Sequence, residues 1–205
     1  MYNMLAEPEA TDIDYSVPKS SLKSLVIQQL NEQLLDDLNN MHKNIAIQAL
    51  EHIHSNEIIM TMGKSKTVEL FLKSAAKKRK FTVIVAETCP FYHGQETAST
   101  LAKEGIETIL IPDSGIFAMM ARVNKVILGT HAVTANGGLI AISGSHMMAL
   151  AAKHHSTPVV VCTGLFKLSP LYPHDRDSFN LYVSPEKCLS YENGNSLKIQ
   201  FSILQ

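Results

Sequence analysis

Polar residues that could do chemistry follow the ends of several apolar runs in this sequence. Ligands of an open parallel sheet bind beyond the carboxyl ends of its strands. If these runs are strands, any site should therefore draw on the residues that come directly after them. Those segments are Gly63-Lys64-Ser65, Glu87-Thr88-Cys89, Asp113-Ser114 and Gly129-Thr130-His131, with Asn136-Gly137-Gly138 shortly behind the last.

The glycine-containing segments have a structural reading beside the chemical one. Gly63-Lys64-Ser65 is similar to the end of a phosphate-binding loop, but that motif needs a glycine five residues earlier, where this chain has Ile58. We therefore interpret the segment as a tight turn into a helix with a polar cap. No GxGxxG follows the first apolar run, and Gly137-Gly138 indicates a turn.

Cys89 and the histidines are the candidates for nucleophilic, acid–base or metal chemistry. Cys89 has a plausible place for a nucleophile, but no base can be assigned to it, so a buried or tolerated cysteine is the preferred interpretation. His131 stands just past a strand, where an acid or base would be useful; a hydrogen-bonded or solvated loop histidine is the alternative. No two histidines have the i, i+4 spacing of a helical metal pair. The sequence therefore predicts no metal site and no cofactor.

The elements that must position these residues follow from hydrophobic patterning. Five short apolar runs suit strands that are buried on both faces of a parallel sheet. Helical patterns lie between them, and Ser145 is expected to cap the last. This alternation predicts an α/β domain with a doubly wound, mostly parallel sheet. The expected strands are 58–62, 82–86, 108–111, 126–128 and 158–162, and the expected helices are 65–78, 95–103, 114–122 and 145–155.

A long helical arm precedes this domain. Apart from the adjacent pair Leu25 and Val26, apolar residues from Leu22 to Ile53 recur at steps of three and four. This predicts one stripe on a helix of about nine turns, with at most one break, near Asn39 and Asn40. Phe179–Val183 is a candidate edge strand. The expected organisation is a loose tail over 1–17, the helical arm over 18–55, the α/β domain over 56–189, and an atypical, incomplete end over 190–205.

Composition argues against several classes of protein. The 205 residues include 18 Lys and Arg and 19 Asp and Glu, a net charge of -1, whereas a dedicated nucleic-acid binder should be basic. No apolar run approaches the roughly 20 residues that cross a bilayer. The N-terminus is acidic and lacks the pattern of a signal peptide. Cys89, Cys162 and Cys188 are widely spaced, which indicates reduced thiols in a cytosolic protein.

Longer strings of residues carry a resemblance to a known family. Together, and in order, they resemble the beta branch of the regulatory alpha, beta and delta subunits of eukaryotic translation initiation factor 2B, over about Gln33 to Cys188. The resemblance implies a Rossmann-like domain behind the helical arm. The strings are 44–46, 48–54, 58–63, 77–81, 122–126, 150–158 and 166–170.

The same resemblance implies a function. The chain would be a non-catalytic regulatory subunit of the guanine nucleotide exchange factor for translation initiation factor 2, responding to phosphorylation of factor 2 alpha. The implied partners are the delta, alpha, gamma and epsilon subunits and factor 2 itself, with no direct nucleic acid and no membrane. The implied location is the cytosol. The sequence departs from the family at both ends, so we expect a truncated form, a splice form or an imperfect gene model.

The wider fold family includes methylthioribose-1-phosphate and ribose-1,5-bisphosphate isomerases, whose chemistry rests on a cysteine after the first strand and an aspartate after the fourth. By the resemblance, Gly63 and His131 hold these two positions, which implies that the chain has no catalytic residues. The isomerase Asn-Gly-Asp is here Asn136-Gly137-Gly138. Two alternatives stay open: an aldose-ketose isomerase for sugar phosphates, and a sensor that keeps a vestigial sugar-phosphate pocket.

Two sets of site residues follow as expectations. The vestigial pocket would use backbone amides of the helix that starts at Ser65 to face an anion; its residues would be Thr61, Gly63, Ser65, Thr130, His131, Asn136 and Gly137. The partner surface is expected at the amino edge of the sheet, which by the resemblance faces the delta subunit, with an ordinary solvated turn as the alternative. Its residues would be His54, Asn56, Glu57, Thr82 and Ile84.

Overall fold

The structure is a computed structural model that describes residues 23–24, 26–28, 30–175, 182–184, 186, 188 and 203–204. The chain divides into two compact units, Met1–Met41 and His42–Gln205, and each is described here by itself. In the described residues, no helix combines the length and the apolar character that a membrane span requires.

The helical arm is continuous across the place where a break was expected. A π-helical segment η1 (Leu30–Leu35) leads into α2 (Asp36–Ile47), and the turn comes at Gln48, ahead of α3 (Ala49–His52). The expectation of a break near 39–40 is wrong, because asparagine lowers helix propensity by only a fraction of a kcal/mol, roughly 0.7 at most. The stripe also divides: Ala49 and Ile53 are fully buried, whereas Leu30 and Leu38 are exposed.

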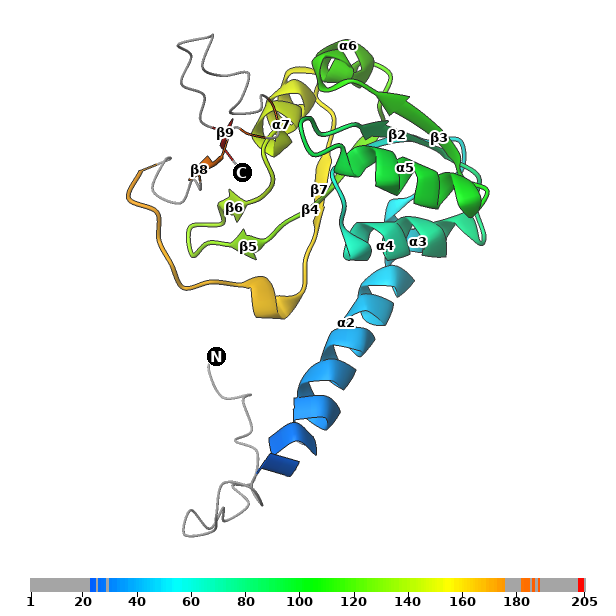
Figure 1. Cartoon of the computed structure of the whole chain (residues 1–205). Helices are drawn as coiled ribbons and strands as arrows, with labels where there is room; N and C mark the ends of the chain where they lie inside the picture. The colour runs from blue at the N-terminus through cyan, green and yellow to red at the C-terminus, as the bar shows by residue number, and fades with distance from the viewer. Residues whose placement is uncertain are drawn as a thin grey trace. The chain divides into compact units, whose positions relative to one another are not determined.

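Five parallel strands form the central sheet (Figure 1). Their order is β3-β2-β1-β4-β7, and Ile58 of β1 lies opposite Thr82 of β2, which lies opposite Glu107 of β3. The order reverses between β1 and β4, which is the switch point of a doubly wound sheet. The predicted fold class is confirmed, with strand limits shifted by at most one residue. The strands are β1 (Ile58–Met62), β2 (Thr82–Ala86), β3 (Glu107–Ile111), β4 (Lys125–Gly129) and β7 (Val159–Cys162).

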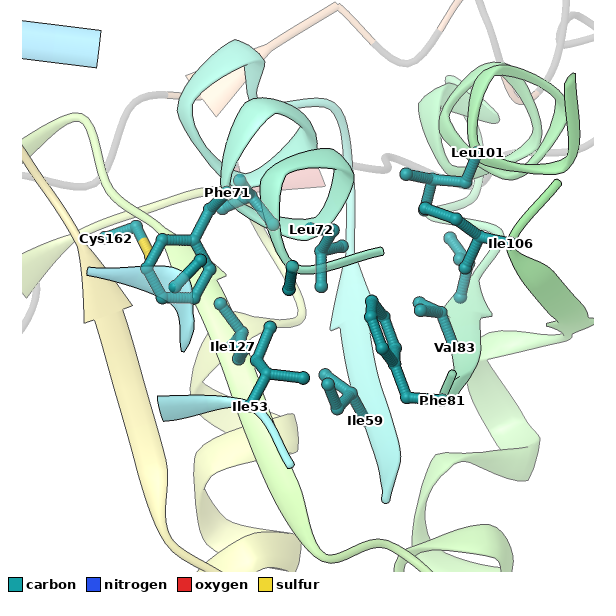
Figure 2. Packing of buried hydrophobic residues seen from close by; sticks show 14 of the residues in the cluster. Ile53, Ile59, Phe71, Leu72, Phe81, Val83, Leu101, Ile106, Ile127 and Cys162 are labelled. Carbon is teal, nitrogen blue, oxygen red and sulfur yellow. The ribbon is translucent and has the colours of Figure 1, made fainter. Parts of the chain in front are cut away.

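Helices cover both faces of the sheet, since alternate strand side chains point to opposite sides. On one face, α3, α4 (Lys66–Ala76) and α5 (His93–Lys103) contribute to a core that includes Ile59, Val83 and Ile127 (Figure 2). On the other, α6 (Ile116–Met120) and α7 (Ser145–His154) pack against Met60 and Ile84.

The start of α7 differs from its prediction. The cap is Gly144, with a φ of 92°, and the Ser145 hydroxyl makes no cap hydrogen bond. Ser145 Oγ lies 3.8 Å from Met62 Sδ in the interior. Ser145 is therefore the first buried residue of the helix. The sequence pattern does not tell whether such a serine is the N-cap or the first residue inside the helix.

Shorter elements complete the fold. β5 (Ala132–Val133) and β6 (Leu139–Ile140) form an antiparallel hairpin that the sequence pattern did not predict, and the 3-10 helices are η2 (Asp113–Gly115) and η3 (Leu165–Lys167). β8 (Tyr182–Val183) pairs antiparallel with β9 (Ile203–Leu204). The rest of the candidate strand Phe179–Val183 and of the end over 190–205 lies outside the described residues.

Candidate functional site

The position directly after β1 is held by Gly63, where the end of the Ile142 side chain fills the space that a Cβ would take. Its φ of 69° is a left-handed backbone that glycine adopts without strain. Its N–H donates to Thr88 Oγ1 at 2.9 Å, and its carbonyl accepts from Thr97 Oγ1 at 2.8 Å. A Cβ atom here would stand 2.1 Å from Ile142 Cδ1. A cysteine, or any other side chain, would have to displace Ile142.

Ser65 closes the neighbouring space at the switch point. It is the cap of α4, and its Oγ accepts from the Val68 N–H at 3.5 Å. A Cβ on Gly129, at the end of β4, would lie 2.6 Å from that same Oγ. The segment Gly63-Lys64-Ser65 is therefore the tight turn with a polar cap that was expected, and it packs directly against the end of β4.

Lys64 points its charge away from this packing. Its Nζ pairs with Glu96 Oε2 at 2.6 Å, and both side chains are more than half exposed. Their hydrogen bond and mutual attraction raise the pKa of Lys64 and lower that of Glu96 from their ordinary values. Surface pairs of this kind contribute little to stability, because solvent screens both charges.

The loop after β2 is held by a carboxylate. Asp113 accepts from the Thr88 N–H at 2.9 Å through Oδ1 and from the Cys89 N–H at 2.7 Å through Oδ2. Thr88 has a φ of 61°, and its hydroxyl donates to the Ala86 carbonyl at 3.2 Å. Charge-assisted bonds to backbone amides are among the stronger hydrogen bonds. Asp113 thus shapes a loop, and both of its oxygens are engaged.

Cys89 is exposed, which excludes the buried alternative and leaves that of a tolerated cysteine. It lies 3.7 Å from the phenol oxygen of Tyr92, and this contact is the main cause that raises the pKa of Tyr92. In the described residues, no histidine or carboxylate makes a side-chain hydrogen bond to its sulfur. The geometry gives this thiol no general base.

The end of β4 leads directly into the β5–β6 hairpin. Thr130 is buried, with its hydroxyl 2.8 Å from the Ile140 carbonyl oxygen, and its own carbonyl accepts from Lys167 Nζ at 2.6 Å. His131 is exposed and donates its backbone N–H to Ile140 at 2.8 Å. Its placement fits the solvated-loop alternative.

Asn136 and Gly137 form the tip of that hairpin. Asn136 Oδ1 accepts from Thr134 Oγ1 at 2.6 Å and from the Gly138 N–H at 3.0 Å, while Gly137 has a φ of 79°. This is a turn, as the sequence indicated, and it stands apart from α4 (Figure 1). The structure therefore brings Gly63 and Ser65 to the switch point, with Thr61 buried beside them in β1 and Thr130 beginning the loop after β4.

Four residues that shape this region were not among the predicted pocket residues. Thr88 and Asp113 belong to segments that the sequence had singled out, because each lies two residues after a strand. Thr97 and Ile142 had no signal in the sequence, since neither follows a central strand and their contacts with Gly63 span 34 and 79 residues of chain. Contacts of that range depend on the packing of whole elements.

At the amino edge, the connection from α3 to β1 is a polar network around Glu57. Its carboxylate accepts from the His54 N–H at 2.9 Å and lies 3.6 Å from Lys125 Nζ. Asn56 has a φ of 65° and donates its N–H to the Lys80 carbonyl at 2.8 Å. His54 and Asn56 are exposed.

The two β2 residues of the expected partner surface lie in different surroundings. Thr82 starts the strand and donates its hydroxyl to Glu107 Oε2 at 3.0 Å, at the edge. Ile84 is 1% exposed and belongs to the core under α6 and α7. Its side chain points into the core, because residue 84 lies two positions inside the strand.

Comparisons with known proteins agree on one family. The model of the Initiation factor 2 subunit family matches residues 1–202. The chain is 58% identical over 187 residues to translation initiation factor eIF2B subunit beta of Dictyostelium discoideum, covering 91% of this chain and 48% of that protein. It is 50% identical over 176 residues to the same subunit of Schizosaccharomyces pombe, covering 85% of this chain and 44% of the relative.

A solved structure extends the likeness to three dimensions. The tetrameric eIF2B-beta2-delta2 complex from C. thermophilum matches with a TM-score of 0.67 and 38% identity, over 77% of this chain and 53% of the matched chain. The chain spans about half the length of the curated relatives it matches. The resemblance read from the sequence is confirmed, and the chain belongs to the Initiation factor 2 subunit family.

Proposed function

We propose that this chain is a non-catalytic regulatory subunit, of the beta type, of the guanine nucleotide exchange factor for translation initiation factor 2. The observation that carries the proposal is the 58% identity to an eIF2B beta subunit across 91% of the chain. In this role the chain works in the cytosol, and the exchange chemistry belongs to the epsilon subunit. The delta, alpha and gamma subunits and factor 2 are its further partners, and phosphorylation of factor 2 alpha is the signal.

The geometry of the switch point supports the absence of catalysis. By the resemblance, an isomerase of this fold needs a cysteine at residue 63 and an aspartate at residue 131. Gly63 has no side chain and is covered by Ile142, and His131 is exposed on the loop beyond β4. General acid–base or nucleophilic chemistry needs groups within hydrogen-bond reach of a substrate. We expect purified protein to show no turnover of a pentose-phosphate substrate; turnover that His131→Ala abolishes would instead establish the isomerase alternative.

The amino edge is the proposed partner surface, with His54, Asn56, Glu57 and Thr82 at its centre. His54 donates its N–H to the Glu57 carboxylate, and Thr82 donates its N–H to the Glu57 carbonyl. Asn56 donates its N–H to the Lys80 carbonyl in the neighbouring connection. Such a polar, ordered rim is typical of protein interfaces. The delta subunit is the proposed occupant, and the solved beta2-delta2 assembly of the relative supports this choice.

Native mass spectrometry of the chain with an eIF2B delta subunit tests the proposal directly. We expect a complex that contains both chains and persists when the two are diluted together. A well-folded chain by circular dichroism, which nevertheless stays separate from a folded delta subunit at micromolar concentration, would contradict the proposal.

A further inference from the structure

The connections that enter the sheet at its amino edge carry an excess of positive charge. We define this edge as residues 54–58, 77–82, 104–107, 121–125 and 155–159, which end at the first residue of each strand. The edge holds six cations and three carboxylates: Lys77, Lys78, Arg79, Lys80, Arg122 and Lys125, and Glu57, Glu104 and Glu107. The whole chain has 18 Lys and Arg against 19 Asp and Glu, so the residues outside the edge hold 12 cations against 16 carboxylates.

Four of these cations are consecutive and form one turn, Lys77–Lys80, which we call the basic turn. It follows α4 directly, because Lys78 and Arg79 both donate their N–H groups to the Ala75 carbonyl, at 3.1 and 3.0 Å. Lys77, Lys78 and Lys80 are exposed. The next residue, Phe81, is buried and leads into β2.

Hydrogen bonds fix the backbone of the basic turn beside the connection from α3 to β1. The Lys80 carbonyl accepts from the Asn56 N–H at 2.8 Å. The Arg79 guanidinium donates to the Ile53 carbonyl, which leaves the three lysines as the outward charges. The basic turn therefore presents its cations at a defined place, next to the polar network around Glu57.

Within the described part of the chain, no carboxylate pairs with the cations of the basic turn. Of the carboxylates at this edge, Glu57 pairs with Lys125 at 3.6 Å, and Glu104 pairs with Lys73 at 3.1 Å. The dipole of α4 favours a cation near its last turn, but this effect falls off within that turn. It does not explain four adjacent cations, which repel one another.

We propose that the basic turn binds an acidic face of the delta subunit, the partner proposed above for the amino edge. The inference rests on the proposed function, since it names the chemistry of the surface that this edge would meet. A field of one sign speeds and orients association with a complementary surface.

An acidic protein surface fits the basic turn better than RNA, whose phosphates would also attract cations. Glu57 and Glu107 lie on either side of Thr82, two residues after the basic turn, and would repel a continuous phosphate backbone. Phe81, the aromatic residue beside the turn, is only 6% exposed and cannot stack on bases. The chain as a whole also has a net charge of -1.

Two double variants with the same change in charge test the inference. Lys78→Glu with Lys80→Glu reverses the basic turn and keeps Arg79 on the Ile53 carbonyl. Lys43→Glu with Lys66→Glu reverses two exposed lysines outside the edge, on α2 and at the start of α4. Each full-length protein is titrated with an eIF2B delta subunit at low and at high salt, and with a single-stranded RNA oligonucleotide.

We expect the variant of the basic turn to bind the delta subunit about tenfold more weakly at low salt and to lose most of the salt dependence, while the control stays within about twofold of the original. Equal affinities for the two variants would overturn the inference and leave the proposed function standing. Tighter binding of RNA than of the delta subunit would contradict the inference that the basic turn binds a protein. Failure of the unaltered chain to bind delta at either salt would overturn the proposed function, and this inference with it.

Discussion

At the scale of single residues, the polar groups that follow the strands mostly hold the backbone of loops. Asp113 and Thr88 follow strands, and both serve the backbone of a loop. Cys89 was expected to be buried or merely tolerated and is exposed, whereas Cys162 ends the edge strand β7 and is buried. Residue type fixes the chemistry that a group can perform, but burial and hydrogen bonding decide whether that group is accessible, and both depend on distant parts of the chain.

Cys162 gives a prediction in the alkaline range. Burial raises the pKa of its thiol from 9.0 to about 12, because a thiolate is poorly solvated in the core. The neutral thiol therefore contributes stability that is complete below pH about 9 and is lost as the pH rises toward about 12. We expect urea midpoints to fall over this window more steeply for the native chain than for Cys162→Ala. At pH 8, a maleimide should label Cys89 readily and Cys162 only after unfolding; rapid labelling of both would contradict this burial.

Asn56 gives a prediction about backbone and interface together. Its φ of 65° is left-handed, which costs an ordinary residue roughly 1–2 kcal/mol. Asn56→Gly should therefore keep the fold, while Asn56→Arg should lower the free energy of unfolding by about 1 kcal/mol and place an unpaired charge at the proposed interface. Denaturant titrations measure the change in the free energy of unfolding. The affinity for a delta subunit measures the effect of the unpaired charge. If both variants bind delta as the original chain does, Asn56 lies outside the interface.

At the scale of elements, the strands could be predicted and several connections could not. Continuous runs such as Ile58–Met62 and Thr82–Ala86 are long enough to show that both faces are buried, so their limits were predicted closely. The β5–β6 hairpin has strands of two residues each, too short for any periodicity. The break at Gln48 had no local signal, because it depends on Ala49 and Ile53 reaching the core.

A comparison of Gly63, at the end of β1, with Gly105 distinguishes the cost of backbone strain from the cost of crowding. Gly63 and Gly105 have similar φ values of 69° and 78°, but a Cβ would overlap Ile142 at the first and meet nothing within 4 Å at the second. Gly105→Ala should cost about 1–2 kcal/mol of stability from strain alone. Gly63→Ala should cost about 1–3 kcal/mol more, since it adds overpacking. Urea unfolding measures both. Adding Ile142→Ala to Gly63→Ala should recover part of that excess; equal costs at both glycines would argue against the overlap.

At the scale of the whole molecule, the second unit leaves a large apolar surface uncovered along the segment from η3 onward. Leu165 is 85% exposed and Phe166 61%, with Leu168, Leu171 and Tyr172 each more than half exposed. Exposed apolar patches of this kind mark association sites. Fold class was predictable at this scale, because alternation of strand and helix is a property of the pattern. The uncovered surface was not, since it depends on how the segments beyond β7 lie.

We therefore expect the chain to self-associate when it is purified alone. Light scattering over a concentration series should show a mass that rises with concentration. Leu165→Ser with Phe166→Ser should reduce that rise, because it removes two adjacent and strongly exposed apolar side chains. Circular dichroism of both proteins checks that the fold is retained. A constant monomer mass at high concentration would count against this expectation.

The Ile142 side chain above Gly63 also constrains the order in which substitutions can accumulate. A residue with a Cβ at position 63 overlaps Ile142, so a lineage that acquires such a residue first passes through a destabilised intermediate. A smaller residue at position 142 opens the space beforehand and leaves only the cost of the left-handed backbone. The effects of substitutions at the two positions are therefore coupled, and a nucleophile after β1 is acquired at lower cost once position 142 is smaller.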